Sequence, residues 1–237
     1  MAYLSYLIDN YVTLPAISLF LHAHRTSWHD NLFGLDAPSM LRRVNLSRVL
    51  DQGYTNLRCG WAPGCPAHIH PGEGPFDAAK PEQIIFGEAW AELFPLAEVP
   101  EVLSQPCCAQ FAVTAETVRR RTRAEYVFWR DWLLGTELED EVSGRVMEYV
   151  YQCGFSFLQS PLVIAVLMRK GIDIFTGSPV HCLSEEDCYC SGYSMCFDQP
   201  GQFRTFINGV NRWNELNALV NDEANSTEPM WLPWSKS

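Results

Sequence analysis

The sequence has little positive charge. Its 237 residues include 17 lysines and arginines against 28 aspartates and glutamates, which gives a formal net charge of −11. Proteins hold phosphate backbones mainly with lysine and arginine, so this balance excludes a protein that coats nucleic acid through its overall charge. Any contact with nucleic acid must be local.

Long apolar runs are also lacking. The most apolar run, residues 155–168, contains Pro161 and several polar residues and is shorter than the roughly 20 residues that cross a bilayer. The first residues, MAYLSYLIDNY, have no basic segment of the kind that opens a signal peptide. We therefore expect no stable membrane span and a cytoplasmic protein.

Three common catalytic and nucleotide-binding signatures are missing. The chain has no Walker motif, no G-x-G-x-x-G and no G-x-S-x-G. Its length and its 47% of hydrophobic residues suit one large domain, or one domain with an appendage, with a substantial core.

The most informative stretch is an apolar run that ends in polar residues. Ile17 to Leu21 is short and continuously apolar, which is typical of a buried strand. In an open α/β sheet, ligands bind just beyond the carboxyl ends of the strands. Five residues follow at this position as candidate site residues: His22, His24, Arg25, Trp28 and His29. If the strand continues, His22 and His24 share a face, where imidazoles suit proton transfer, an anion or a metal, or one of the pair is structural and the other exposed.

Periodicity predicts an α/β protein. We expect helices over residues 2–11, 40–50 and 84–94, from an N-cap at Thr114 to Leu134, and around 146–150. Further short strands are expected over 54–57 and 108–113, and Gly53 should stop the helix before the first of them. The proline- and glycine-rich residues 59–80 predict a long loop.

One local basic cluster stands in this acidic chain, interleaved with aromatic residues. Its members are Arg119, Arg120, Arg121, Arg123 and Arg130. They could contact phosphate or nucleic acid. They could equally form a solvated helix face that Glu116, Glu125 and Asp131 balance.

An acidic cluster follows, with four carboxylates in the five residues 137–141. Acidic residues at a helix start favour the helix dipole. Alternatively, Glu139, Asp140 and Glu141 could bind a guanidinium or a divalent metal, and Arg145 and Glu148 lie close by in sequence. A carboxyl with a raised pKa in this region could serve as a general base.

Nine cysteines are many for a cytosolic protein, and four of them lie within residues 182–196. No C-x-x-C zinc pair is present, so we expect disulfides in an oxidising compartment and free thiols otherwise. Because nine is an odd number, one cysteine has no disulfide partner, and we expect it to be Cys153.

Several ordered blocks resemble a largely fungal family of unknown function. They include residues 2–11 (AYLSYLIDNY), 20–25 (FLHAHR), 107–113 (CCAQFAV) and 143–146 (SGRV). The family is similar to divergent glycosyltransferases of the GT-A kind, which implies a Rossmann-like sheet flanked by helices. In it, the strand with Gln110 and the acidic stretch before Arg145 would line the site.

The family also resembles the fungal secondary-metabolite enzymes that make arginine-containing cyclodipeptides from aminoacyl-tRNAs. For such an enzyme, His22, His24 or Glu148 would be the general base, and the acidic cluster would bind the guanidinium. Arg25, Trp28, His29, Gln110 and Arg145 would contact substrate, and the basic cluster would hold the tRNA. No cofactor is then required, because the aminoacyl ester is already activated.

The alternatives are a glycosyltransferase that uses a nucleotide sugar and a divalent metal, or an inactive remnant of one. Relative to the family, the chain is expected to be N-terminally shortened and to carry an apolar insertion at 153–173. The expected organisation is an α/β core over 1–152, this insertion, and a Cys-rich segment with a C-terminal helix and tail over 174–237.

Overall fold

The computed structural model describes residues 1–30, 33–72, 74–155 and 182–226, with the backbone alone for 33 and 217–226. Most of the predicted insertion and the last residues of the predicted tail lie outside these ranges. The chain divides into two compact units, which we describe separately. The first contains Met1–Ala23 and Arg43–Cys196, and the second contains His24–Arg42 and Phe197–Ser237.

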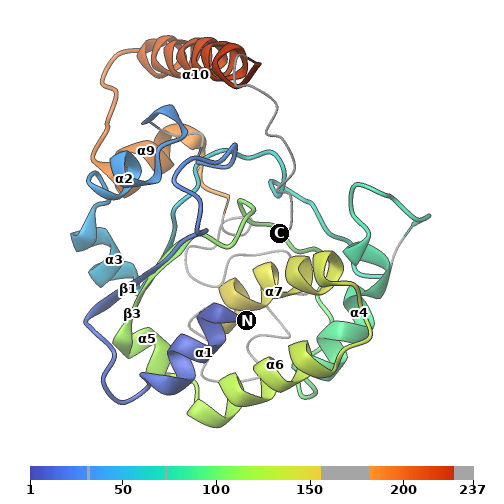
Figure 1. Ribbon diagram of the computed structural model, residues 1–237. Coiled ribbons are helices and arrows are strands. Elements are labelled where there is room, and N and C mark those ends of the chain that lie inside the picture. Colours follow the sequence, from blue (N-terminus) through green and yellow to red (C-terminus); the bar gives the residue numbers. More distant parts are fainter. Residues whose placement is uncertain (31–32, 73, 156–181, 227–237) are drawn as a thin grey trace, which may run out of the picture. The chain divides into compact units, whose positions relative to one another are not determined.

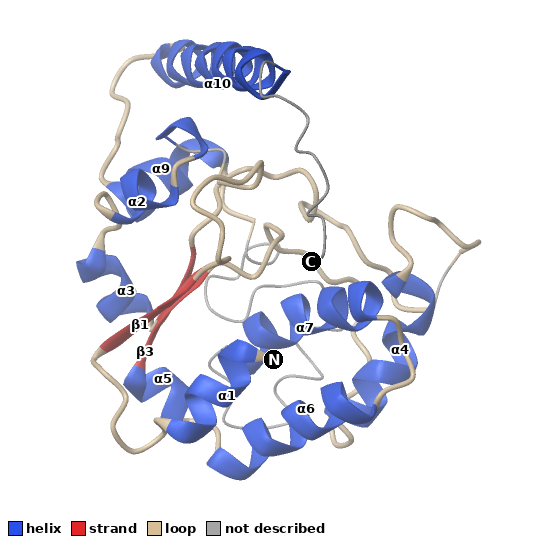
Figure 2. Ribbon diagram, in the orientation of Figure 1, coloured by secondary structure: helices blue, strands red, loops and turns tan. Residues whose placement is uncertain are grey.

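A small antiparallel sheet lies in the first unit. Its strands are β1 (Ile17–Phe20), β2 (Tyr54–Asn56) and β3 (Phe111–Thr114), in the order β1-β3-β2. β3 pairs antiparallel with both neighbours, and Phe20 and Asn56 both lie opposite Phe111. The protein is therefore mixed α/β, as predicted, and all three strands were located. The parallel, Rossmann-like sheet that the resemblance implies is not formed by the described residues, in which helices predominate (Figure 2).

The helices of the first unit are α1 (Ala2–Asp9), α3 (Leu46–Gln52), α4 (Glu82–Leu93), α5 (Ala115–Arg119), α6 (Arg123–Gly135), α7 (Asp140–Phe155) and α9 (Glu185–Tyr193). Figure 1 shows α6 running alongside α1, and α4 beside α7. Aromatic rings fill the core between helices and sheet, where the fully buried Phe111 packs against Tyr3, Phe20, Tyr151 and Phe155.

Two helices that the sequence predicts as continuous are each broken by a cap. The expected helix over 40–50 is α2 (Ala37–Leu41) and α3, because the Asn45 side chain accepts a hydrogen bond from Arg48 N–H and starts a new helix. The expected helix from Thr114 to Leu134 is α5 and α6. Thr114 caps α5 as predicted, and Thr122 then forms a capping box with Glu125 that starts α6. Gly53 ends α3 with a φ of 77°.

Disulfides tie the Cys-rich segment to the rest of the first unit. Cys59 pairs with Cys188 and Cys65 with Cys182, so two bonds join α9 and the residues before it to the start of the long loop. The other two bonds are Cys107–Cys108 and Cys190–Cys196. Cys153 is a free, buried thiol, which confirms the prediction that it is the cysteine without a disulfide partner.

The second unit contains a short 3₁₀ turn, η1 (Phe33–Leu35), α2 and the long helix α10 (Gln202–Ser226). η1 and α10 contact each other. A Cβ on Gly34 would lie 2.0 Å from the Trp213 ring, so only glycine fits there. In neither unit does a described helix have the length and apolar character needed to cross a membrane.

Candidate active site

The candidate site is built around a backbone turn at Cys107 and Cys108, immediately before β3. The two adjacent cysteines are disulfide-bonded, and Cys108 and Ala109 have left-handed φ angles of 84° and 45°. Two contacts to the end of β2 and the residue after it hold the turn: Asn56 Nδ2 donates to Pro106 O at 3.0 Å, and Leu57 N–H donates to Gln110 O at 2.9 Å. The predicted strand over 108–113 is therefore wrong in its first three residues, which form this turn.

The peptide groups of Cys108 join two of the predicted catalytic residues. Glu148 Oε2, on α7, accepts a hydrogen bond from Cys108 N–H at 2.8 Å. His22 Nε2 lies 2.6 Å from Cys108 O. A carbonyl oxygen only accepts, so Nε2 carries the proton, and in the neutral ring the lone pair is on Nδ1. Residues 22, 108 and 148 thus form one hydrogen-bonded unit.

The environment of Glu148 favours its neutral form. Burial raises the pKa of this half-buried carboxyl above the usual glutamate value, and the negative charge of Glu82 raises it further. The hydrogen bond from Cys108 N–H and the positive charges of His22 and Arg145 act in the opposite direction without cancelling the effect of burial. A carboxyl with a raised pKa can take up or release a proton closer to neutral pH than an exposed glutamate can.

Tyr3 of α1 also belongs to this site. Burial and then the charge of Glu148 raise the pKa of Tyr3 to about 12, so its hydroxyl keeps its proton. The sequence pattern places Tyr3 on the apolar face of the first helix, and its ring does pack against Phe20 at 4.9 Å. Its proximity to Glu148 has no signal in the sequence.

One turn before Glu148 on α7, Arg145 connects the site to the acidic cluster. Its guanidinium contacts Glu141 at 2.7 Å, the buried Glu82 at 3.4 Å and Ala79 O at 2.8 Å. Glu139, Asp140 and Glu141 lie exposed at the start of α7, and Glu139 O accepts from Val142 and Ser143 N–H groups. Eight residues of helix, or about 12 Å, separate Asp140 from Glu148.

Arg58 supports the turn from its other side. Its side chain is buried and donates to Gly60 O at 3.3 Å and Ala62 O at 2.6 Å. Its Nη1 lies 3.8 Å from Cys108 Sγ. No local pattern predicts this contact between a buried guanidinium and a sulfur, because 50 residues separate Arg58 from Cys108.

The remaining predicted substrate residues are His24, Arg25, Trp28, His29 and Gln110. β1 ends at Phe20, so the condition for His22 and His24 to share a strand face is not met. The residues His24, Arg25, Trp28 and His29 belong to the second unit. There Arg25 pairs with Asp36 at 3.0 Å, and Trp28 is exposed with its ring against His29. Gln110 is buried at the start of β3.

Comparison with known proteins gives a family. Residues 1–191 match the family described as Protein of unknown function (DUF3431). The chain belongs to the DUF3431 family. No curated protein and no solved structure was found to match it. All members of the candidate site, from Tyr3 to Glu148, lie within the part of the chain that matches DUF3431.

The basic cluster of this DUF3431 protein is occupied by contacts within the chain. Arg119 donates to Tyr11 O and Val12 O, and Arg123 donates to Ile8 O, so both bind the end of α1 and the residues after it. Arg120 pairs with Glu116 and Arg130 with Asp131. The ion pairs of Arg120 and Arg130 agree with the alternative in which neighbouring carboxylates balance the arginines, whereas Arg119 and Arg123 bind backbone carbonyls.

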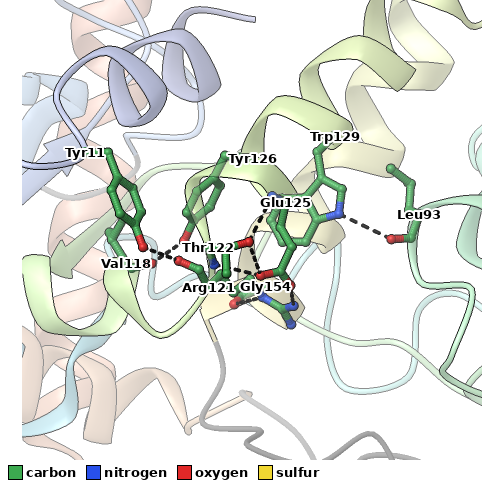
Figure 3. Close-up of polar contacts among 9 residues, drawn as sticks. All are labelled: Tyr11, Leu93, Val118, Arg121, Thr122, Glu125, Tyr126, Trp129 and Gly154. Carbon is green, nitrogen blue, oxygen red and sulfur yellow. Dashed lines mark hydrogen bonds and ion pairs between the residues drawn. The ribbon is translucent and has the colours of Figure 1, made fainter.

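Arg121 is the most enclosed of these arginines (Figure 3). Its Nε donates to Gly154 O at 2.6 Å, its Nη1 contacts Glu125 at 2.9 Å, and its guanidinium lies over the Trp129 ring. Burial disfavours ionised Glu125, but hydrogen bonds from Thr122 and the charge of Arg121 outweigh it and lower the pKa of Glu125. Arg121 therefore joins Glu125 of α6 to Gly154 near the end of α7.

The described part of the DUF3431 chain contains no group of three or more His, Cys, Asp or Glu side chains that could hold a metal ion. The half-buried carboxyl of Glu148 and the exposed imidazole of His22 are side chains that can take up and release protons.

Proposed function

We propose that this DUF3431 protein is an acyl-transfer enzyme that forms amide bonds from aminoacyl esters. The observation that carries the proposal is the Glu148–Cys108–His22 unit, in which a carboxyl with a raised pKa and an imidazole are held by one backbone residue. Amide formation from an ester needs a base for the attacking amine and a proton for the leaving oxygen. The unit contains a group for each task.

In the proposed reaction, ionised Glu148 takes a proton from the attacking amino group. The amine nitrogen then bonds to the ester carbonyl carbon, the C–O ester bond breaks, and the leaving ribose oxygen of the first tRNA takes the proton that Glu148 removed from the amine. In a second transfer, the free amino group of the linked dipeptide attacks the remaining ester carbonyl, which closes the diketopiperazine and releases the second tRNA with the proton from that amine. His22 would stabilise the charge that develops, because its ring is fixed on Cys108 O.

The proposed substrates are two aminoacyl-tRNAs, one of them charged with arginine. The exposed carboxylates of Glu139 and Asp140 support this choice, since carboxylates bind guanidinium groups with paired hydrogen bonds. Glu141 already contacts Arg145, so a substrate guanidinium would compete with that ion pair.

The tRNA partner would meet the exposed arginines of the basic cluster. Arg119 and Arg123 have exposed side chains, although each also holds a backbone carbonyl. Arg121 is a poor choice for testing this contact, because its loss would disturb the junction of α6 and α7. Arg119→Glu with Arg123→Glu should therefore reduce the salt dependence of tRNA binding.

A GT-A-like glycosyltransferase, or its inactive remnant, is the alternative. In it, the acidic cluster would hold a divalent metal against a nucleotide sugar, and activity would vanish with a chelator. The Glu148 unit favours the aminoacyl hypothesis, because a carboxyl with a raised pKa suits proton transfer from an attacking amine.

Location bears on the choice of substrate. A tRNA substrate requires a protein in the cytoplasm, whereas four disulfides are typical of proteins that fold in an oxidising compartment. Trapping the thiols in intact cells with an alkylating agent, before lysis, would decide between the two. Eight protected cysteines would contradict a cytoplasmic location.

The test is expression of the chain in a heterologous host, followed by mass spectrometry for new arginine-containing diketopiperazines. Glu148→Gln keeps the shape of the side chain and removes the base, so the product should disappear. Glu88→Gln, at an exposed glutamate of α4, is the matched control and should leave the product unchanged. Equal product from Glu148→Gln and the unaltered chain would overturn the role of Glu148.

A further inference from the structure

The geometry points to the Cys107–Cys108 disulfide as a reducible site that a dithiol opens in the folded protein, and that controls the catalytic unit. The observation is a juxtaposition of three features. The bond lies in the turn that holds His22 and Glu148, one of its sulfurs lies against the buried Arg58, and its backbone is left-handed.

The two sulfurs differ in their surroundings, which sets the direction of attack. Cys107 is partly exposed, whereas Cys108 is only 7% exposed and lies beside the Arg58 guanidinium. A thiolate of the dithiol attacks Cys107 Sγ and forms a mixed disulfide, and Cys108 leaves as a thiolate. The positive charge of Arg58 stabilises that thiolate, which makes Cys108 the better leaving group.

The second step completes the reduction. The second thiolate of the dithiol attacks the dithiol's own sulfur that is bonded to Cys107 Sγ in the mixed disulfide. Cys107 is released and takes up a proton, and the dithiol becomes a cyclic disulfide. Two electrons pass from the dithiol to the cysteine pair, and no other reactant is needed.

Opening the bond changes the backbone that connects the catalytic residues. Left-handed φ angles are unfavourable for residues with a Cβ, and Cys108 and Ala109 both have them. The closed ring of the adjacent cysteines holds this conformation. Once the ring opens, Cys108 can return to a negative φ. Its N–H and C=O then turn away from Glu148 and His22, and the unit separates.

The Cys59–Cys188 disulfide provides an internal reference. It joins segments 129 residues apart, and Cys59 is 1% exposed. A left-handed residue costs about the free energy of a tenfold change in an equilibrium constant. We therefore expect Cys107–Cys108 to be half reduced at about a tenfold lower dithiothreitol concentration than Cys59–Cys188.

The experiment is a dithiothreitol titration of the purified, folded protein, with acid quench, alkylation and mass spectrometry of the cysteine peptides. Cys107 and Cys108 should be alkylated before Cys59 and Cys188. In the reduced protein, Arg58→Met should shift the alkylation of Cys108 to higher pH, and Arg58→Lys, which keeps the charge, should shift it less. A Cys107–Cys108 bond that outlasts Cys59–Cys188, or a Cys108 reactivity that is the same with Arg58→Met, overturns the proposal.

The control over catalysis rests on the proposed function and has a separate readout. Reduction should lower product formation, and Cys107→Ser with Cys108→Ser should have the activity of the reduced protein and no further response to dithiothreitol. Full activity in this double variant overturns the control. If no form of the protein makes product, the proposed function fails, while the alkylation order still decides whether the bond is a reducible site.

Discussion

Replacing Arg121 with methionine tests whether this arginine of the basic cluster stabilises the fold. Methionine keeps much of the aliphatic length and removes the charge and the donors. The change deletes a charged hydrogen bond to Gly154 O, worth about 1.5–3 kcal/mol, and leaves that carbonyl without this donor. It also deletes the contact with the Trp129 ring, 5.1 Å from the guanidinium carbon, worth about 0.5–1 kcal/mol.

Together these losses predict a decrease of about 2–4 kcal/mol in the free energy of unfolding of Arg121→Met. The pair with Glu125 adds little to this figure, because that carboxylate is 43% exposed. Urea unfolding followed by tryptophan fluorescence would measure the change, since Trp129 is buried beside the substitution. The matched control is Arg130→Met on α6, which removes an ion pair between adjacent residues at the surface and should cost less than about 1 kcal/mol.

The reasoning is refuted if both variants unfold at the same urea concentration as the unaltered protein. A loss of tRNA binding by Arg121→Met without any loss of stability would also refute it. That result would make Arg121 a ligand for nucleic acid rather than a tie between α6 and α7.

Three further predictions follow from the same region and from the site. Gly154→Ala would place a Cβ 2.6 Å from the Trp129 ring and should destabilise the protein by about 1–3 kcal/mol in urea unfolding. Thr122→Ala removes the cap of α6 and should cost about 1 kcal/mol; it should also weaken the acid-sensitive stabilisation from Glu125, whose lowered pKa gives stability that is lost as the pH falls below about 4. Because the pKa of Glu148 is raised, product formation should increase with pH, with a midpoint above about 4.3. The unfolding free energy should fall over the same pH interval as the carboxyl ionises, and Glu148→Gln should remove this pH dependence.

Local patterns predicted the elements of the fold well. The apolar run from Ile17, the glycine at position 53 and the N-cap at Thr114 are each decided by neighbouring residues, and the structure has them where expected. The two broken helices were missed because the caps at Asn45 and Thr122 lie inside runs whose apolar spacing continues through the break.

The site was predictable only in part. Glu148 and His22 were chosen as proton-transfer groups from their residue types and neighbours, and their meeting depends on contacts across 40 and 86 residues to Cys108. No periodicity encodes such contacts. Arg58 and Tyr3 have no signal in the sequence for the same reason, because Arg58 meets Cys108 and Tyr3 meets the charge of Glu148 only in the folded chain.

The arginines show the opposite case, in which composition suggested a ligand site and the structure gives the residues partners within the chain. Each of the five has an acceptor nearby, and three of those acceptors are carboxylates within four residues in sequence. Acidic residues that alternate with a basic cluster in sequence therefore neutralise part of its charge, here that of Arg120, Arg121 and Arg130.

The central claim is that Glu148 acts as the base of an aminoacyl transfer. The most direct measurement incubates the purified protein with arginyl-tRNA and a second aminoacyl-tRNA and follows the diketopiperazine by mass spectrometry, with Glu148→Gln and Glu88→Gln alongside. The account predicts product from the unaltered protein and from Glu88→Gln, and none from Glu148→Gln. Product at the same rate from Glu148→Gln, or no product from the folded, oxidised protein, would contradict it.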